Sequence, residues 1–496
     1  MSFSLSMRAK LPVMTEWRVG LGMLKVEPLT GEEVYEIERA AFDVLEKVGI
    51  EIRQHEALRL LKDAGAAVDS NRMVAKIPPY LIREALRCVP NGFRLAGRDR
   101  KRPLRVEKGS TYFATGDAKN IIGLDGRVRA STLKDAETYT TLADALDQVH
   151  FVYVIGVQDV PPILSDRYRY YIGFKNTTKP ITAYIRSAEG ARDVVKMAKV
   201  IAGGEEELRK APPFYYGYSA VSPLCWDTAE LDAFEVLVKN GIPVSVESCP
   251  MLGASGPATI AGCLVVAHAE ILAGILLNQL YRRGAPCIYC MGGAYIIDMR
   301  TCETVNGSPE VGLITAAGAQ LAGHHDLPSM SWVRTDSKIH DVQAGYEKAT
   351  SALMQISSGN NLIWGIGSME SNTSASYKQA VIDNEIFPMA LRAARGITVN
   401  SETLARDIIE KVGIKGHFLA ENHTLRNYSK ECIVPELTDR WSRRRWERDG
   451  RKGMEDKALQ KATEILQTHK PEPVPKDIEQ ELWQIVKMAE EKHGNA

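Results

Sequence analysis

Short apolar or aromatic runs alternate with longer amphipathic stretches between residues 111 and 368. Each run is followed by a polar turn and then by apolar residues at helical spacing. Successive runs begin 29 to 43 residues apart, which suits a strand-plus-helix unit, and eight such units close into a (β/α)8 barrel. We therefore expect parallel strands at 111–116, 152–159, 181–186, 213–219, 243–248, 285–292, 328–334 and 361–368.

The stretches between these runs predict the outer helices of the barrel. Several of them end in glycine, the usual residue after a helix, and one begins with Ser308 followed by proline, which is typical of a helix start. The predicted helices are 132–148, 166–178, 189–204, 228–241, 259–284, 309–325, 341–359 and 376–396.

The flanking segments have helical periodicity without the alternating runs. The N-terminal segment predicts helices at 30–49, 55–65 and 78–89, followed by a solvated turn or small hairpin. Near the C-terminus, a capped helix at 401–413 precedes a long charged segment.

The overall prediction is an α/β fold, a (β/α)8 TIM barrel with helical extensions at both ends. The three regions are a helical N-terminal region (1–105), the barrel (106–397) and a helical C-terminal extension (398–496). A stiff linker (470–475) leads into a final helix (476–491) with one apolar face, which we expect to dock on the same chain or on a second subunit.

Composition excludes some classes of function. Lys plus Arg and Asp plus Glu number 62 each, and this balance argues against a nucleic-acid-binding protein. No stretch of about 18 uncharged apolar residues occurs, because the longest candidate (259–280) contains His268 and Glu270. The N-terminus lacks the pattern of a signal peptide, so we expect a cytoplasmic protein without membrane contact.

Two sequence features resemble metal sites. Cys287 and Cys290 have CxxC spacing, but residues three apart in a strand point to opposite faces, so a shared metal is disfavoured. His324, His325 and Asp326 end the helix before the seventh strand, at the lower face of the barrel and away from its chemistry. We therefore expect no bound metal in this chain.

Aromatic residues gather where the strands are predicted to end, whereas Val, Ile and Leu usually fill a barrel. Aromatic rings with a few charges suit an organic cation, and we hypothesise that Tyr112, Tyr295, Trp332 and Trp364 supply most of a cage. The alternative is that these rings only pack in the core. Glu247, at the end of the fifth strand, either contacts the substrate or holds a loop.

Familiar catalytic motifs do not occur. The sequence has neither GxxxxGK[ST] nor GxGxxG, and it lacks HExxH and GxSxG. The sequence therefore does not support the function of a kinase or an ordinary hydrolase.

Three segments are similar to a known family. The segment TDSKIHDVQAGYEKA (335–349), the Trp-Gly-x-Gly strand (364–367) and the segment 250–274 resemble the trimethylamine methyltransferase family over nearly the whole chain. The resemblance implies a (β/α)8 barrel that passes a methyl group to the cobalt of a separate corrinoid protein, in the one-carbon metabolism of methanogens or acetogens.

The trimethylamine enzymes of that family encode pyrrolysine in the barrel, whereas this sequence contains only the standard residues. It therefore resembles the non-pyrrolysine branch, and the glycine betaine:corrinoid methyltransferases most. The resemblance implies methyl transfer from a quaternary amine, with glycine betaine favoured, to the Co(I) corrinoid (cobalamin) of a partner protein. The alternatives are the same chemistry on proline betaine, carnitine or another betaine, and a non-catalytic scaffold that binds betaine and the corrinoid protein.

The chemistry of that branch requires few catalytic groups from the protein. A quaternary ammonium group already carries positive charge, so its leaving group is a neutral amine, and the cobalt is the nucleophile. We therefore expect no catalytic side chain, but an aromatic cage and an anchor for the substrate carboxylate. Arg334 or His340 is the predicted anchor; the alternative is that internal salt bridges only hold this loop together.

The corrinoid must cover the barrel mouth, because cobalt has to reach the methyl group. The loops 116–120, 250–257 and 367–375 offer small residues and hydrogen-bonding groups for this contact. Gly253, Gly256, Gly367 and Ser368 are the predicted cofactor-binding residues; the alternative is that the glycines only permit tight turns. The C-terminal helices also predict a homo-oligomer.

Overall fold

The computed structural model describes residues 24–292 and 296–493. Six parallel strands form one curved sheet in the order β11-β13-β14-β17-β18-β6. Every neighbouring pair in this sheet is parallel, as the alternation of strand and helix requires. The strands are β6 (Tyr112–Thr115), β11 (Tyr216–Ser219), β13 (Val244–Ser248), β14 (Cys287–Met291), β17 (Ser329–Trp332) and β18 (Leu362–Ile366).

Two further short parallel strands lie between β6 and β11 in the sequence. β9 (Val152–Tyr153) and β10 (Ile181–Thr182) pair with each other in parallel. Single parallel bridges join Ala114 to Phe151 and Ile181 to Phe214. Each of the eight predicted runs therefore contains a parallel strand.

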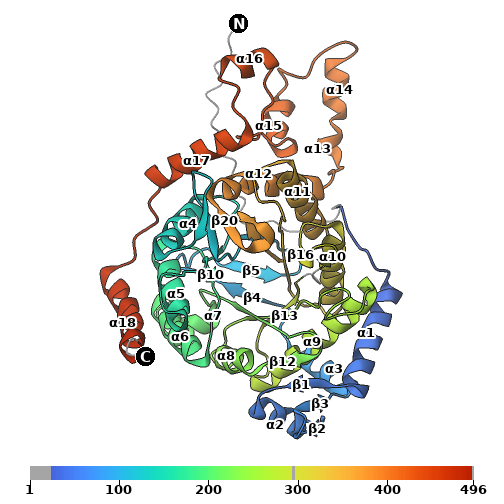
Figure 1. The fold of residues 1–496 in the computed structure, drawn as a ribbon. Helices are drawn as coiled ribbons and strands as arrows, with labels where there is room; N and C mark the ends of the chain where they lie inside the picture. Colours follow the sequence, from blue (N-terminus) through green and yellow to red (C-terminus); the bar gives the residue numbers. More distant parts are fainter. Residues whose placement is uncertain (1–23, 293–295, 494–496) are drawn as a thin grey trace.

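Helices surround these strands, as Figure 1 shows in a view with the strands at the centre. Every predicted barrel helix is present, and a short helix, α7 (Glu205–Lys210), and a single turn, η1 (Pro162–Leu164), are added. The helices are α4 (Leu133–Ala145), α5 (Ser165–Asn176), α6 (Ala188–Ala202), α8 (Thr228–Lys239), α9 (Ile260–Tyr281), α10 (Pro309–His324), α11 (Val342–Ser357) and α12 (Tyr377–Ala394).

The N-terminal region contains the predicted helices α1 (Gly31–Lys47), α2 (His55–Ala64) and α3 (Pro79–Cys88). Its helical periodicity did not predict the small sheet between them, in which one strand comes from the barrel region. Because each strand has only two or three residues, alternation is too short to be recognised in the sequence. The strands are β1 (Ile50–Ile52), β2 (Ala67–Asp69), β3 (Val74–Lys76) and β12 (Cys225–Trp226).

A β-hairpin lies beneath the amino ends of the barrel strands. β4 (Gly92–Leu95) and β5 (Leu104–Glu107) are antiparallel, and Figure 1 shows them inside the ring of helices. Leu95 and Val106 belong to one buried cluster with the side chains that point into the barrel. The predicted hairpin is therefore present, but it packs against the barrel instead of lying in solvent.

Small sheets extend three of the loops that follow the strands. The loops after β6 and β18 together form a four-stranded sheet in which β20 and β7 are parallel. The segment after β14 forms a hairpin. These elements are β7 (Asn120–Ile122), β8 (Val128–Ala130), β15 (Ile296–Asp298), β16 (Glu303–Val305), β19 (Ser368–Met369), the turn η2 (Glu370–Asn372) and β20 (Ser374–Ser376).

Helix α9 is, within the described residues, the one helix long and apolar enough to cross a membrane by composition alone. About 72% of its most apolar window is buried inside the protein. It packs against α1, α3 and strands β13 and β14. Its apolar character is therefore that of a core helix, as His268 and Glu270 within it indicated.

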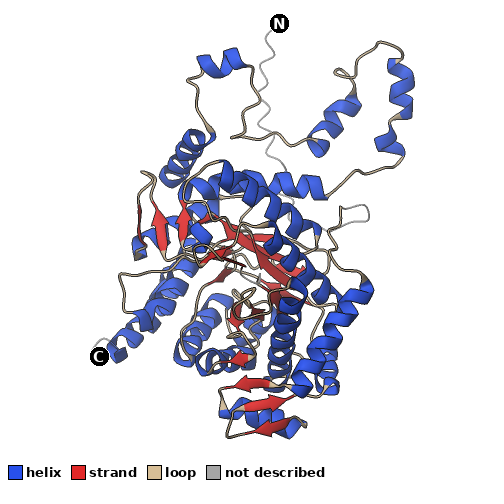
Figure 2. Cartoon of the chain, turned by 45° about the vertical axis from the view of Figure 1, so that its right-hand side comes forward, coloured by secondary structure: helices blue, strands red, loops and turns tan. Residues whose placement is uncertain are grey.

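The C-terminal extension has two parts. Helix α18 (Lys476–His493) packs on α5 and α6 of the same chain, where the Trp483 ring lies 5.1 Å from that of Tyr171. Between Ile397 and Gly453, by contrast, the chain projects from the body (Figure 2), and Leu437 is its only buried side chain. The helices are α13 (Ser401–Leu404), α14 (Arg406–Val412), α15 (Asn422–Glu431), α16 (Arg443–Arg448), α17 (Met454–Thr468) and α18.

Candidate functional site

A cavity of about 140 Å³ opens where the parallel strands end. Five aromatic rings and two carboxyl groups contribute to its wall, which is a composition suited to an organic cation. The lining residues are Tyr153, Thr182, Tyr184, Tyr215, Tyr216, Gly217, Ser219, Glu230, Glu247, Met330 and Trp364.

Glu247 occupies its place in the wall because the neighbouring strand has no side chain there. A Cβ atom added to Gly217 would lie only 2.0 Å from Glu247 Oε1. Burial raises the pKa of Glu247 to about 7, although the positive charge of Arg334 acts in the opposite direction. A cation entering the cavity would favour the ionised form of this carboxyl.

A second carboxyl group lies in the same wall. Tyr184 donates a hydrogen bond from its hydroxyl to Glu230 Oε1 at 3.1 Å. Burial also raises the pKa of Glu230 to about 7, and its charge contributes to the raised pKa of Glu247. Two acids that ionise near neutral pH therefore face one cavity, which is the kind of perturbation found at functional sites.

Trp332 and Trp364 are register partners on adjacent strands, and their ring centroids are 4.9 Å apart. The Arg334 guanidinium carbon lies 4.2 Å from the Trp332 centroid and 5.3 Å from that of Trp364. Both indole N–H groups are buried without a hydrogen-bond partner in the described part of the chain. Of the two rings, Trp364 lines the cavity, where it lies 5.3 Å from the Tyr153 ring.

Hydrogen bonds fix the loop that follows β17. Arg334 Nη1 donates to Asn306 Oδ1 at 2.7 Å. The Asp336 carboxylate accepts from the backbone N–H groups of Asn306 and Gly307 and from the Ser371 hydroxyl. Hydrogen bonds thus hold this loop, Arg334 contributes to them, and its role as the anchor of a ligand stays a prediction.

His340, the other predicted anchor, lies outside the cavity lining. Its Nε2 is 2.7 Å from the Ser376 hydroxyl, and its Nδ1 is 3.3 Å from Glu455 Oε1 in helix α17. Burial lowers the pKa of this imidazole. The structure therefore brings His340 to the contact between the barrel and the C-terminal extension.

The structure separates the predicted cage residues. Tyr112 begins β6 opposite Leu362, two residues before Trp364 along β18. Its hydroxyl accepts the Arg105 N–H of the hairpin at 3.1 Å, so Tyr112 belongs to the opposite end of the barrel. Tyr295 lies outside the described residues.

The predicted cofactor-binding residues differ in their surroundings. Gly253 is exposed, and an added Cβ would meet only the Ala258 methyl group, at 3.9 Å. At Gly256 the same atom would lie 2.6 Å from Cys263 Sγ, and at Gly367 it would lie 1.9 Å from the Tyr139 hydroxyl oxygen. Ser368 is buried, and its hydroxyl donates to Asn372 Oδ1. Internal packing thus explains Gly256 and Gly367, while their contact with a corrinoid stays a prediction.

Sequence reasoning missed Tyr153 and Tyr215, which line the cavity. Tyr218 stacks on Phe234 of helix α8, with centroids 5.0 Å apart, and so faces outwards. Strand alternation was the available signal, because it places residues 215 and 217 on the face opposite to residue 218. Cys287 and Cys290 follow the same rule and lie in different buried clusters.

Comparisons with known proteins agree on one family. The sequence matches the family described as Trimethylamine methyltransferase (MTTB) over residues 6–494. The trimethylamine methyltransferase MttB of Desulfitobacterium hafniense is 36% identical over 474 residues, covering 94% of each chain. A protein named glycine betaine methyltransferase, from the same species, is 31% identical over 471 residues, covering 93% of this chain and 97% of that protein.

The solved structure of the hydroxylamine complex of MtmB has a similar fold, with a TM-score of 0.51. It is 14% identical, and the match covers 96% of this chain and 95% of that one. At this identity the likeness concerns the fold alone. The family match and the curated relatives extend over nearly the whole sequence, and the chain therefore belongs to the trimethylamine methyltransferase family.

Proposed function

We propose that this methyltransferase moves a methyl group from a quaternary amine, with glycine betaine favoured, to the corrinoid of a partner protein. The observation that carries the proposal is the polarity of the cavity region. Carboxyl groups and aromatic rings line the cavity itself, and one guanidinium lies beside its tryptophan wall. A betaine has the matching charges, a quaternary ammonium and a carboxylate.

The proposal includes a closed (β/α)8 barrel between residues 106 and 397, flanked by an N-terminal region and a C-terminal extension. The two single bridges, at Phe151 and Phe214, support closure because they lie between β6 and β9 and between β10 and β11. Closure would place all eight strand ends at one mouth, where active sites of this fold are found.

In this proposal the trimethylammonium group occupies the cavity between Trp364, Tyr153 and Tyr215. Their rings present negative faces to the cation, and Glu247 adds a full negative charge when it is ionised. A desolvated contact between a cation and one ring contributes about 2 kcal/mol. Several rings would therefore suffice to hold a ligand as small as a betaine.

Arg334 is the proposed anchor of the substrate carboxylate. Its guanidinium lies against both tryptophans, where the two indole N–H groups lack partners among the described side chains. A carboxylate can accept several such hydrogen bonds at once, and charge-assisted bonds of this kind contribute roughly 1.5–3 kcal/mol. A tail held here and a cation held by the cavity would fix the orientation of the methyl groups.

The departing amine leaves as a neutral molecule, so this chain has to donate no proton to it. A Co(I) corrinoid, when bound, supplies the nucleophile that accepts the methyl group. The chain's own task is to exclude water from the ammonium group and to hold one C–N bond in line with the mouth.

The three predicted docking loops support a partner at the mouth. Loops 116–120 and 367–375 adjoin strands of one small sheet, and Leu252 of the third loop bridges to Ile296 of the β15–β16 hairpin. Gly253 is the position at which another surface can approach closely.

The projecting segment between Ile397 and Gly453 supports a homo-oligomer, because helices with so little buried surface gain stability by packing on another copy. We propose that the enzyme acts in the cytoplasm.

Calorimetric titration of the full chain tests substrate and anchor together. Glycine betaine is expected to bind more tightly than choline, which lacks the carboxylate, and Arg334→Gln is expected to remove that preference. Proline betaine, carnitine and trimethylamine serve as competing ligands in the same titration. Equal binding of choline and betaine by the wild type would show that Arg334 does not hold the tail.

Methyl transfer to free cob(I)alamin, followed by its visible spectrum, tests the reaction itself. Glycine betaine is expected to methylate it only with the protein present. Betaine binding without methyl transfer, either to free cob(I)alamin or to a corrinoid protein, would favour the scaffold alternative. If a different amine methylated cob(I)alamin and glycine betaine did not, that amine would be assigned as the substrate.

A further inference from the structure

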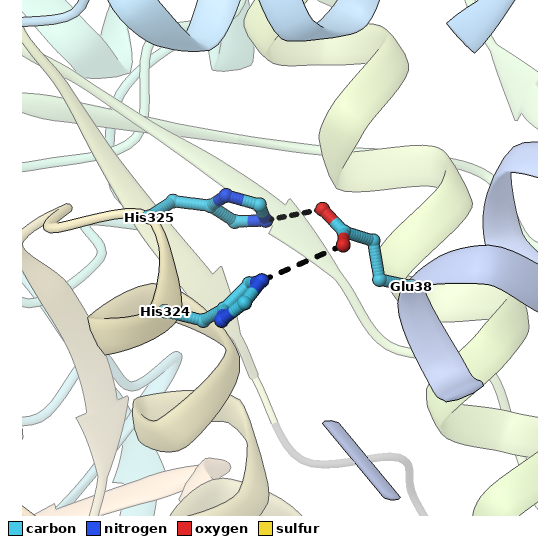
Figure 3. Close-up of side chains that lie close together, drawn as sticks. All are labelled: Glu38, His324 and His325. Carbon is cyan, nitrogen blue, oxygen red and sulfur yellow. Dashed lines mark ion pairs between the residues drawn. The ribbon is translucent and has the colours of Figure 1, made fainter. Parts of the chain in front are cut away.

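Two histidines and a glutamate meet at the end of the barrel opposite the cavity. Glu38 comes from helix α1, His324 is the last residue of α10, and His325 follows it (Figure 3). The ligand atoms of the three side chains lie within 4.8 Å of one another. His324 and His325 were a recognisable pair in the sequence, but Glu38 is almost 290 residues away and only the fold brings it there.

Each imidazole nitrogen lies from one oxygen of the Glu38 carboxylate at about the spacing of two ligands of one metal ion. His325 Nε2 lies 3.3 Å from Glu38 Oε1, and His324 Nε2 lies 3.5 Å from Glu38 Oε2. Two ligand atoms about 2.1 Å from a tetrahedral zinc ion are separated by about 3.4 Å. Figure 3 shows both imidazoles directed toward the same carboxylate.

Hydrogen bonding does not account for the arrangement. His325 Nε2 is buried and makes no hydrogen bond with the described residues, although Glu38 is so close. His268 stacks on His325 with centroids 5.9 Å apart, and its own buried Nε2 also lacks a partner among those residues. Buried polar atoms without partners are rare and call for an ion or a water.

The electrostatics fit the same interpretation. Glu38 is itself 8% exposed and has no Lys or Arg ion pair among those found in the structure. Asp326, which the sequence grouped with the histidines, forms an ion pair with Lys108 instead.

We propose that Glu38, His324 and His325 bind one zinc ion, or a divalent ion of similar ligand preference. Two imidazoles and a carboxylate are a ligand set that zinc accepts. The ion would join helix α1 to the end of α10 and so hold the N-terminal region on the barrel. It would be a structural ion, because the cavity lies at the other ends of the strands.

The test uses the full chain without an affinity tag, first treated with a chelator and then titrated with Zn²⁺. The expected result is about one tightly bound zinc ion per chain and a rise of roughly 2–5 °C in the midpoint of thermal unfolding at about 100 times Kd. Glu38→Gln and His324→Gln are each expected to weaken binding more than about tenfold. Co²⁺ in place of zinc would report coordination by its visible spectrum.

The matched controls are Glu36→Gln, an exposed carboxyl on the same helix, and His55→Gln, an exposed imidazole nearby in the chain. Both are expected to keep wild-type zinc affinity. Zinc binding that is equally weak in the wild type and in Glu38→Gln would overturn the proposal, as would equal losses in the controls. Because His324 is 40% exposed, its variant remains informative if Glu38→Gln fails to fold.

Discussion

Aromatic side chains lie at both ends of the parallel strands, but their polar atoms are paired differently. At the amino end of β6, the Tyr112 hydroxyl accepts a backbone N–H of the hairpin, and Leu95 and Val106 fill the remaining space. At the carboxyl ends, the indole N–H groups of Trp332 and Trp364 are buried without described partners. An aromatic residue with a satisfied polar atom closes a barrel, whereas unsatisfied atoms beside a cavity leave a site for a ligand.

Charge shows the same contrast. The hairpin end presents apolar groups and backbone bonds to the barrel, while the cavity end keeps Glu230 and Glu247 in surroundings that raise both pKa values to about 7. Burying such carboxyl groups disfavours their ionised forms and lowers stability, and a cationic ligand would offset that cost. Substitutions at each end therefore test whether this difference between the ends is a difference in function.

The largest expected effect on binding comes from Glu247→Gln, which removes the charge and keeps the shape. A quaternary ammonium donates no hydrogen bond, so the lost contact is coulombic, roughly 3 kcal/mol for unit charges about 5–6 Å apart at an effective dielectric constant of about 20. Betaine binding should therefore weaken on the order of 100-fold, as measured by calorimetry. The matched control is Glu270→Gln, because Glu270 is a buried carboxylate whose partners, Ser222 and the Leu224 N–H among them, are all internal. That variant should lower thermal stability and leave betaine affinity unchanged; the reverse pattern would place the cation elsewhere.

A somewhat smaller effect is expected from Trp364→Leu, which keeps apolar bulk and removes the ring. The loss of one desolvated cation–π contact, about 2 kcal/mol, should weaken betaine binding about thirtyfold. Trp332→Leu should weaken it less, because Trp332 is absent from the cavity wall and contacts Arg334 instead. Equal affinities for the wild type and a folded Trp364→Leu protein would remove this ring from the proposed cage.

The dependence of binding on pH follows from the raised pKa values. Below pH 7 the carboxyls of Glu247 and Glu230 are protonated in the free protein, so a cationic ligand loses its counter-charge. Betaine affinity should therefore rise with pH up to about 7 and fall roughly tenfold per unit below it for each carboxyl that must ionise. Glu247→Gln should flatten the profile. An unchanged slope in that variant would assign the titration to another group.

Much of the fold could be predicted from the sequence, because strand and helix periods repeat over the whole barrel. Its strands and helices were found, and so were the hairpin and the last helix. It was harder to predict at which end of the sheet each aromatic residue lies. Tyr112 and Trp364 look alike in sequence, but Tyr112 pairs with Leu362, two residues before Trp364, and so lies nearer the other end. Register between strands depends on packing across the barrel, and a single sequence does not display it.

The same limit explains the partial success at the site. Glu247 and Arg334 lay at the ends of predicted strands and Trp364 in the middle of one, and the structure places all three in or beside one cavity. Tyr215 lies early in its predicted strand and was not singled out, although it lines the cavity. His340 looked equivalent to Arg334 in sequence, but its contact with Glu455 depends on where a distant helix docks.

The smallest expected effect belongs to the closed end of the barrel. Tyr112→Phe removes only the hydroxyl that accepts the Arg105 N–H, so the free energy of unfolding should fall by about 1 kcal/mol. Betaine affinity should not change, because the ring keeps its place in the buried cluster and the cavity is lined by other residues. Thermal unfolding and calorimetry on the same preparation measure both quantities. A loss of affinity without a loss of stability would restore Tyr112 to the cage that the sequence suggested, and it would mean that the two ends are not separate in function.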